Sequence, residues 1–150
     1  MEWLGQLGFA LPLGLGAIGS SLGIGAAGRA AAGAWAKEAK AGKGMNFIYL
    51  ALAGMPLSQT IYAFVMMLVI LKSRVYGEVI SEHPGAFFSI GLACGLGELF
   101  SAWMQGVIGA SGIRAMCDSE GKPFTNTLIA MGIAETVGLF SFVFMFLMMP

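Results

Sequence analysis

Charged residues are scarce in this 150-residue chain. Asp, Glu, Lys and Arg together make up 11% of it, whereas a soluble domain averages about 25%. Hydrophobic residues make up 57%, and the mean hydropathy is +0.81. This composition excludes an ordinary soluble domain and indicates an integral membrane protein with little mass outside the bilayer. The net charge is zero and no basic patch is evident, so we expect no nucleic-acid partner.

Cysteine and histidine are nearly absent. The two cysteines, Cys94 and Cys117, are expected on one helix or just past its end. Their separation would then be about 35 Å, so no disulfide joins them within the chain. The one histidine, His83, falls in a polar loop and is interpreted as solvated. The first nine residues contain an acid and no basic group, so we expect no cleavable signal peptide.

Four long hydrophobic stretches account for most of the chain. They cover residues 4–36, 45–71, 86–113 and 124–149. Each is long enough to cross a hydrocarbon core of about 30 Å as a helix. We therefore predict an all-α, multi-pass integral membrane fold with four transmembrane helices in a single membrane domain, residues 1–150.

The basic residues are distributed unevenly over the three connecting loops, 37–44, 72–85 and 114–123. Six lie in or beside the first and third loops, namely Arg29, Lys37, Lys40, Lys43, Arg114 and Lys122. The middle loop has only Lys72 and Arg74. Because basic residues favour the cytoplasmic side, we predict that loops 37–44 and 114–123 are cytoplasmic and that both termini face outward.

The two halves of the chain resemble each other. Residues 59–64, QTIYAF, line up with residues 135–140, ETVGLF. This repeat predicts a duplicated helical hairpin, with hairpin 1 at residues 1–72 and hairpin 2 at residues 86–150. The first span carries nine glycines, which allow helices to pack closely in lipid, and such faces favour assembly with further copies. Residues 14–19 match a dinucleotide-binding fingerprint, but a hydrophobic helix with no preceding strand excludes that interpretation.

Glu135 is the only charged residue of the last span. A carboxylate near the middle of a transmembrane helix costs roughly 2.5–3.5 kcal/mol on insertion scales, so an acid there is a functional candidate. The alternative is a protonated or hydrogen-bonded glutamate that only holds helices together.

Further polar residues recur at helical spacing in the second and third spans. One stripe is Met55, Ser58, Gln59 and Tyr62, and the other is Glu98, Ser101 and Gln105. Pro56 interrupts the first stripe and should bend its helix, because proline has no N–H to donate. Buried polar groups need partners, and these side chains either satisfy one another or surround a dehydrated cation with oxygen ligands.

These motifs, in this order, resemble the proteolipid subunit K of V-type ATPases, the rotor-ring subunit also called c. The likeness covers nearly the whole chain and is closest to the sodium-transporting bacterial branch. It rests on Pro56, the Ser58–Gln59 pair and Tyr62, on Gln105 in FSAWMQG, and on Glu135 followed by Thr136. The resemblance implies a Na⁺ site formed by Glu135, Gln105, Gln59, Ser58 and the backbone carbonyl of Met55, with Tyr62 supporting the carboxylate.

The resemblance also implies partners and a place of action. They are a homo-oligomeric ring, a stator membrane subunit with a basic residue, a central-stalk subunit on the cytoplasmic side, lipids, and a prokaryotic plasma membrane. The chain itself would be non-catalytic and would bind no nucleotide. Glu98 departs from the family pattern and is either a silent protonated acid or part of an ion exit path. Two other functions stay open: an H⁺-carrying ring, and a small multidrug/proton antiporter.

Overall fold

The computed structural model describes residues 2–150, and all regular structure in that part is helical. The elements are α1 (Glu2–Lys40), α2 (Ile48–Gly54), the 3₁₀ turn η1 (Met55–Leu57), α3 (Ser58–Val65), the π-helical η2 (Met66–Leu71), α4 (Glu78–Glu82), α5 (Pro84–Asp118) and α6 (Phe124–Leu147). The all-α prediction is confirmed.

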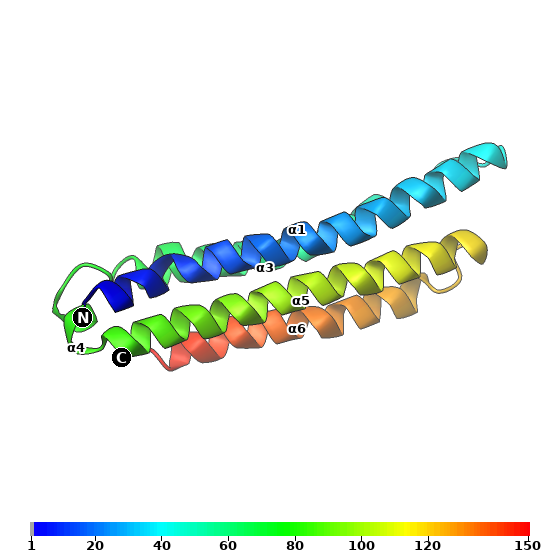
Figure 1. The fold of residues 1–150 in the computed structure, drawn as a ribbon. Coiled ribbons are helices and arrows are strands. Elements are labelled where there is room, and N and C mark those ends of the chain that lie inside the picture. Colours follow the sequence, from blue (N-terminus) through cyan, green and yellow to red (C-terminus); the bar gives the residue numbers. More distant parts are fainter. Residues whose placement is uncertain (1) are drawn as a thin grey trace.

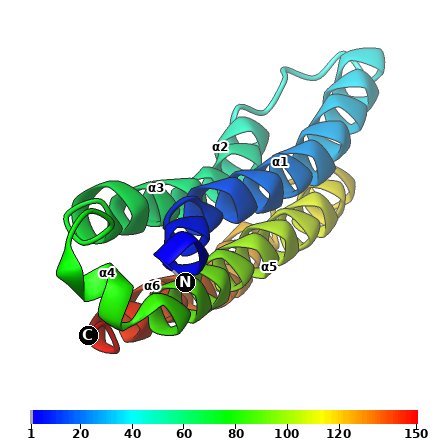
Figure 2. The ribbon, with the colours of Figure 1, turned by 60° about the vertical axis from the view of Figure 1, so that its left-hand side comes forward.

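The helices form two antiparallel hairpins that lie side by side. α1 returns through the segment from α2 to η2, and α5 returns through α6 (Figure 1). α1 and α5 make the most extensive contact between elements, and α6 packs chiefly on α5. Both termini lie at the same end of the bundle, as Figure 2 also shows. The duplicated hairpin is thus confirmed, and α1 and α5, the two glycine-rich helices, form its central pair.

Four helical segments are long and apolar enough to cross a membrane. They are Glu2–Lys40, Ile48–Val69, Pro84–Asp118 and Phe124–Leu147. The predicted spans were too short for the first and third helices, which continue to Lys40 and Asp118. A Lys37–Asp118 ion pair joins these extensions. α5 also begins earlier than predicted, at Pro84, because proline suits the first turn of a helix. The loop predicted at 72–85 contains the short helix α4.

Cys94 and Cys117 both lie on α5 and are free thiols. The prediction that no disulfide joins them is confirmed. The extended helix fixes their separation, since a rigid helix cannot bring together two residues that are about six turns apart.

Glycines allow α1 and α5 to pack with their backbones in contact. Gly23 meets Gly106 in this way, and Gly8 meets Gly91 near the terminal end. A methyl group at either site of a pair would collide with the opposing main chain. The glycines therefore set the spacing of the central pair, and through it the position of every polar side chain that α5 carries.

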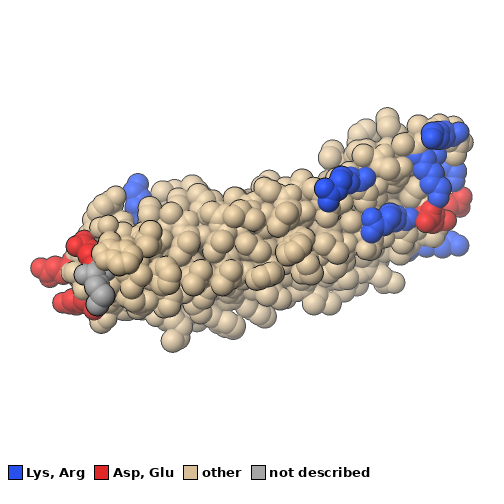
Figure 3. Space-filling model, in the orientation of Figure 1, with Lys and Arg blue, Asp and Glu red and all other residues tan. Residues whose placement is uncertain are grey.

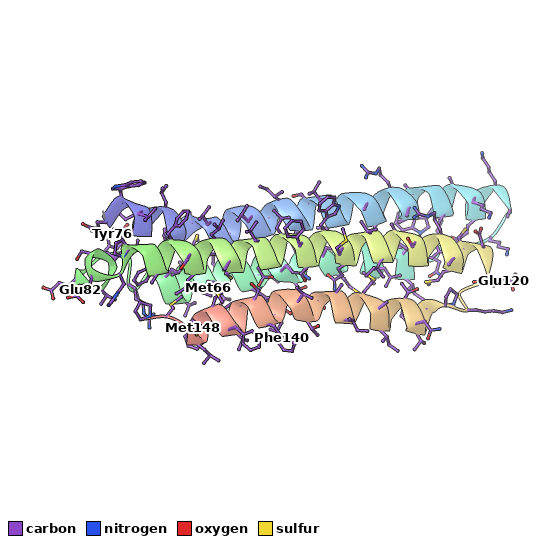
Figure 4. All side chains as sticks on the ribbon, turned by 60° about the horizontal axis from the view of Figure 1, so that its bottom comes forward. Met66, Tyr76, Glu82, Glu120, Phe140 and Met148 are labelled. Atoms are coloured by element: carbon purple, nitrogen blue, oxygen red, sulfur yellow. The ribbon has the colours of Figure 1, made fainter. Side chains whose placement is uncertain are left out.

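Charged side chains gather at the two ends of the bundle, and the long middle of the face drawn in Figure 3 has no charged residues. The end formed by the loops after α1 and α5 contains most of the basic residues, whereas Glu2, Glu78 and Glu82 lie toward the other end. Phe140 of α6 and Met148, just after α6, point away from the other helices (Figure 4) and are 53% and 70% exposed. This apolar exterior suits contact with lipid or with another copy.

Replacing Gly23 by Ala should destabilise the protein, because the new methyl group would collide with the Ala102 carbonyl oxygen and lie 2.9 Å from the Pro56 ring. Overpacking of this kind costs about 1–3 kcal/mol. Gly25→Ala on the same helix is the matched control, because nothing lies within 4 Å of the added carbon. Thermal unfolding of the detergent-solubilised protein should show a lower midpoint for Gly23→Ala alone. Equal midpoints would contradict this account of α1–α5 packing.

Candidate ion-binding site

Pro56 interrupts the second membrane-crossing segment at the predicted place. The α-helix stops at Gly54, a 3₁₀ turn covers Met55–Leu57, and α-helix resumes at Ser58. The Pro56 carbonyl accepts a hydrogen bond from Ser20 Oγ at 2.5 Å, and Ser20 in turn accepts one from Thr60 Oγ1 at 2.7 Å. Sequence reasoning gave no role to Ser20 or Thr60. Their bonds fix the interrupted segment against α1 and so orient the polar residues that follow.

The Glu135 carboxylate receives a hydrogen bond on each oxygen. Tyr62 donates its hydroxyl to Oε1 at 2.9 Å, and Gln105 donates Nε2 to Oε2 at 3.2 Å. The glutamate comes from α6, the tyrosine from α3 and the glutamine from α5, so three helices meet at this acid. Glu135 is half-buried, which leaves its carboxylate at the outer surface of the bundle rather than sealed inside it.

Gln59 links the second segment to the same network. Its side chain is fully buried, and its Nε2 donates to Ser101 Oγ at 3.0 Å and to Gln105 Oε1 at 3.2 Å. The single hydroxyl proton of Ser58 is shared between Gln59 Oε1, 3.0 Å from Oγ, and the Met55 carbonyl oxygen, 3.1 Å from Oγ. Every residue that the sequence nominated for the site around Glu135 therefore lies in one continuous chain of hydrogen bonds.

Acceptor capacity remains in this network after the internal bonds are counted. Ser58 Oγ acts only as a donor in it, so both of its lone pairs are unused. The side-chain oxygens of Gln59 and Gln105 each accept one hydrogen bond and can accept a second contact. Together with Glu135, these oxygens can hold a proton or a dehydrated monovalent cation. They can also remain as an interhelical hydrogen-bond network.

Ser101 is a member of this network that the sequence placed in the polar stripe of the third span but that the resemblance left out of the ligand set. Its hydroxyl accepts from Gln59 and donates to the Ala134 carbonyl at 2.7 Å. Gln105 likewise donates to the Met131 carbonyl at 3.2 Å. Both bonds tie α5 to the α6 backbone close to Glu135. The helical stripe of Glu98, Ser101 and Gln105 already indicated that Ser101 faces the same side of its helix as Gln105.

Glu98 is separate from these bonds. It is fully buried, and both of its carboxyl oxygens lack a hydrogen-bond partner among residues 2–150. Its Oε2 lies against Gly138 of α6, where an added Cβ would be 2.7 Å away, and Ser101 Oγ would be 2.9 Å from the same carbon. The structure therefore places Glu98 beside the site but does not join it to Glu135 by a hydrogen bond.

Comparison with known proteins agrees with this architecture. The family model for the C subunit of ATP synthase matches the chain twice, over residues 7–70 and 88–148. A similar protein is the A-type ATP synthase subunit K of Methanocaldococcus jannaschii, which is 31% identical over 137 residues, 91% of this chain. The chain spans 57% of the length of that relative.

The family bears out two expectations: membership among the proteolipid subunits of rotary ATPases, and a non-catalytic membrane subunit. The two matches fall on the two hairpins, one on each. With the family model covering most of its length, this four-helix chain belongs to the family of ATP synthase C subunits.

Proposed function

We propose that this chain is a rotor-ring subunit of a rotary ATPase and that it carries Na⁺ at Glu135. The observation that supports this most directly is the polar network that ends at the carboxylate. Hydrogen bonds link Ser58 through Gln59 and Gln105 to one oxygen of Glu135, and Tyr62 donates to the other. The family match and the A-type relative support the assignment to a rotary complex. The oxygen-rich network supports Na⁺ as the ion.

The choice of Na⁺ over H⁺ rests on the number of polar groups at membrane depth. A proton needs only a carboxylate and apolar surroundings, and each additional polar group in lipid is costly unless it is satisfied. A dehydrated hard cation needs several oxygens, and two amides, a hydroxyl and the Met55 carbonyl share one hydrogen-bond network with the carboxylate. One negative charge matches one monovalent cation.

In the proposed mechanism, the bound ion neutralises Glu135 so that the site can face lipid at tolerable cost. Its half-buried position on α6 leaves it open to exchange. A basic residue of a stator subunit would pair with the empty carboxylate and so favour release of the ion. The Tyr62 and Gln105 hydrogen bonds would hold the carboxylate in place while it is empty. Moving one elementary charge across a membrane potential of 100 mV changes its electrostatic energy by about 2.3 kcal/mol.

In the proposed ring, α1 and α5 lie inside, and α6 with the segment from α2 to η2 lies outside. The close backbone contact of α1 with α5 suits the narrower inner circle. The cytoplasmic loops would contact a central-stalk subunit, and the ATP chemistry of the complex would take place on partner subunits.

Bound Na⁺ should protect Glu135 from carbodiimide. The reagent attacks a protonated carboxyl, and a coordinated sodium ion excludes the proton from the site. The labelling rate of the purified ring should therefore fall as Na⁺ rises at neutral pH, with K⁺ at equal ionic strength as the control. Labelling that follows pH alone and ignores millimolar Na⁺ would instead identify an H⁺ ring, with the amides serving as interhelical bonds.

Gln105→Ala should weaken the protection by Na⁺. Gln105 contacts Gln59, Met131 and Glu135, and its removal strands buried partners. That costs about 1–3 kcal/mol, which corresponds to a loss of Na⁺ affinity of about five- to 150-fold. Gln6→Ala is the matched control, because Gln6 is exposed and bonds only to Glu2 on its own helix. Equal Na⁺ affinity in the two variants would remove Gln105 from the ligand set.

The proposed orientation can be tested with single cysteines introduced into a cysteine-free variant. Ala41→Cys lies in the loop after α1, and Tyr76→Cys lies in the middle loop, and both positions are exposed. Since basic residues favour the cytoplasmic side, an impermeant maleimide should label the Ala41→Cys variant only in inverted vesicles. It should label the Tyr76→Cys variant only in right-side-out vesicles. The reverse pattern would place the termini in the cytoplasm.

A further inference from the structure

Glu98 is a buried acid that the proposed mechanism does not use. It lies on the inner face of α5, one turn before Ser101 and two turns before Gln105. Its exposed fraction is 0%, and among the described residues its two oxygens are the buried side-chain polar atoms that lack a hydrogen-bond partner. Buried polar atoms are nearly always paired in native proteins, so this exception calls for a ligand.

The surroundings of Glu98 accommodate its carboxyl group specifically. Gly138 presents bare backbone to it, and a methyl group at that position would approach Oε2 to 2.7 Å. Gly16 of α1 packs chiefly against Ala63, whose Cβ would lie 2.8 Å from an added carbon, and the Glu98 Cβ is in ordinary contact at 3.5 Å. The missing side chain at Gly138 therefore leaves the space that the Glu98 carboxyl group occupies.

Charge balance at Glu98 requires a cation or a proton. Glu98 is fully buried, and an isolated buried carboxylate is very costly. A proton would remove the charge, but even with its O–H turned toward Ser101 the acid would keep one buried oxygen without a partner. A cation that both oxygens coordinate would satisfy the two atoms together.

Ser101 can supply a further ligand. Its hydroxyl accepts one hydrogen bond from Gln59 and donates one to Ala134, which leaves one lone pair free. Ser101 Oγ and Glu98 Oε2 both lie against Gly138. The chain therefore offers three oxygens here, fewer than surround Glu135, and water would supply the rest of the shell.

We propose that Glu98, with Ser101 Oγ, forms a second site for a monovalent cation, so that each chain binds two Na⁺ ions rather than one. This inference rests on the proposed function, because it assigns the same ion to both carboxylates. The inner site is the weaker of the two, since it offers fewer ligands and is buried behind the Glu135 site.

Equilibrium binding of ²²Na⁺ to the purified ring, counted per chain in a choline background, tests the proposal. Wild-type protein should bind two ions in two steps of different affinity. Glu98→Gln should lose the weaker step and keep the tighter one, and Glu135→Gln should lose the tighter step. One ion per chain in the wild type, lost in Glu135→Gln and kept in Glu98→Gln, would overturn the second site and leave the proposed function standing. No Na⁺ bound at all would overturn both.

A second pair of variants keeps the test decisive if Glu98→Gln fails to assemble. Gly138→Ala places a methyl group against Glu98 Oε2 and Ser101 Oγ and should abolish the weaker step. Gly132→Ala, also on α6, has nothing within 4 Å of the added carbon and should retain both steps. Ring integrity on a denaturing gel confirms that each variant is assembled. An unchanged weaker step in Gly138→Ala would contradict the inner site.

Discussion

The structure depends on one constraint: within a bilayer, each buried polar group must find its partner in the protein. Around Glu135 this constraint is met by a single run of hydrogen bonds that begins at the Met55 carbonyl and passes through Gln59 and Gln105 to the carboxylate. Because the run crosses three helices, no one helix can shift without breaking a buried bond. The same bonds that hold the bundle together thus set the geometry of the ion site.

Close helix packing is what allows such short side chains to meet. Gly23 and Gly106 bring α1 and α5 into backbone contact, and α5 in turn supplies both Gln105 and Ser101 to the site. Ser20 of α1 holds the interrupted second segment at the Pro56 carbonyl. The glycine-rich helices are therefore part of the functional architecture, although none of their glycines touches the carboxylate oxygens of Glu135.

Much of this arrangement could be predicted from the sequence because it follows from helical periodicity. Ser58, Gln59 and Tyr62 recur at spacings that fix one face of a helix, and a single acid in an apolar span identifies Glu135. Periodicity says nothing of helix ends, which depend on tertiary partners such as the Lys37–Asp118 pair. It placed Ser101 on a polar face but could not give its partners, and it could not assign Gly138, since these depend on which residue of a different helix they face.

The internal repeat bears on the role of Glu98, because it shows how many carboxylates the two hairpins have at equivalent positions. Gln59 in the first hairpin aligns with Glu135 in the second. Two identical hairpins would have a carboxylate at both of these positions, whereas this chain has one. Gln59 is instead linked to Glu135 through its hydrogen bond with Gln105. A second ion at Glu98 would bring the number of bound ions to two per chain, with both acids in the second hairpin.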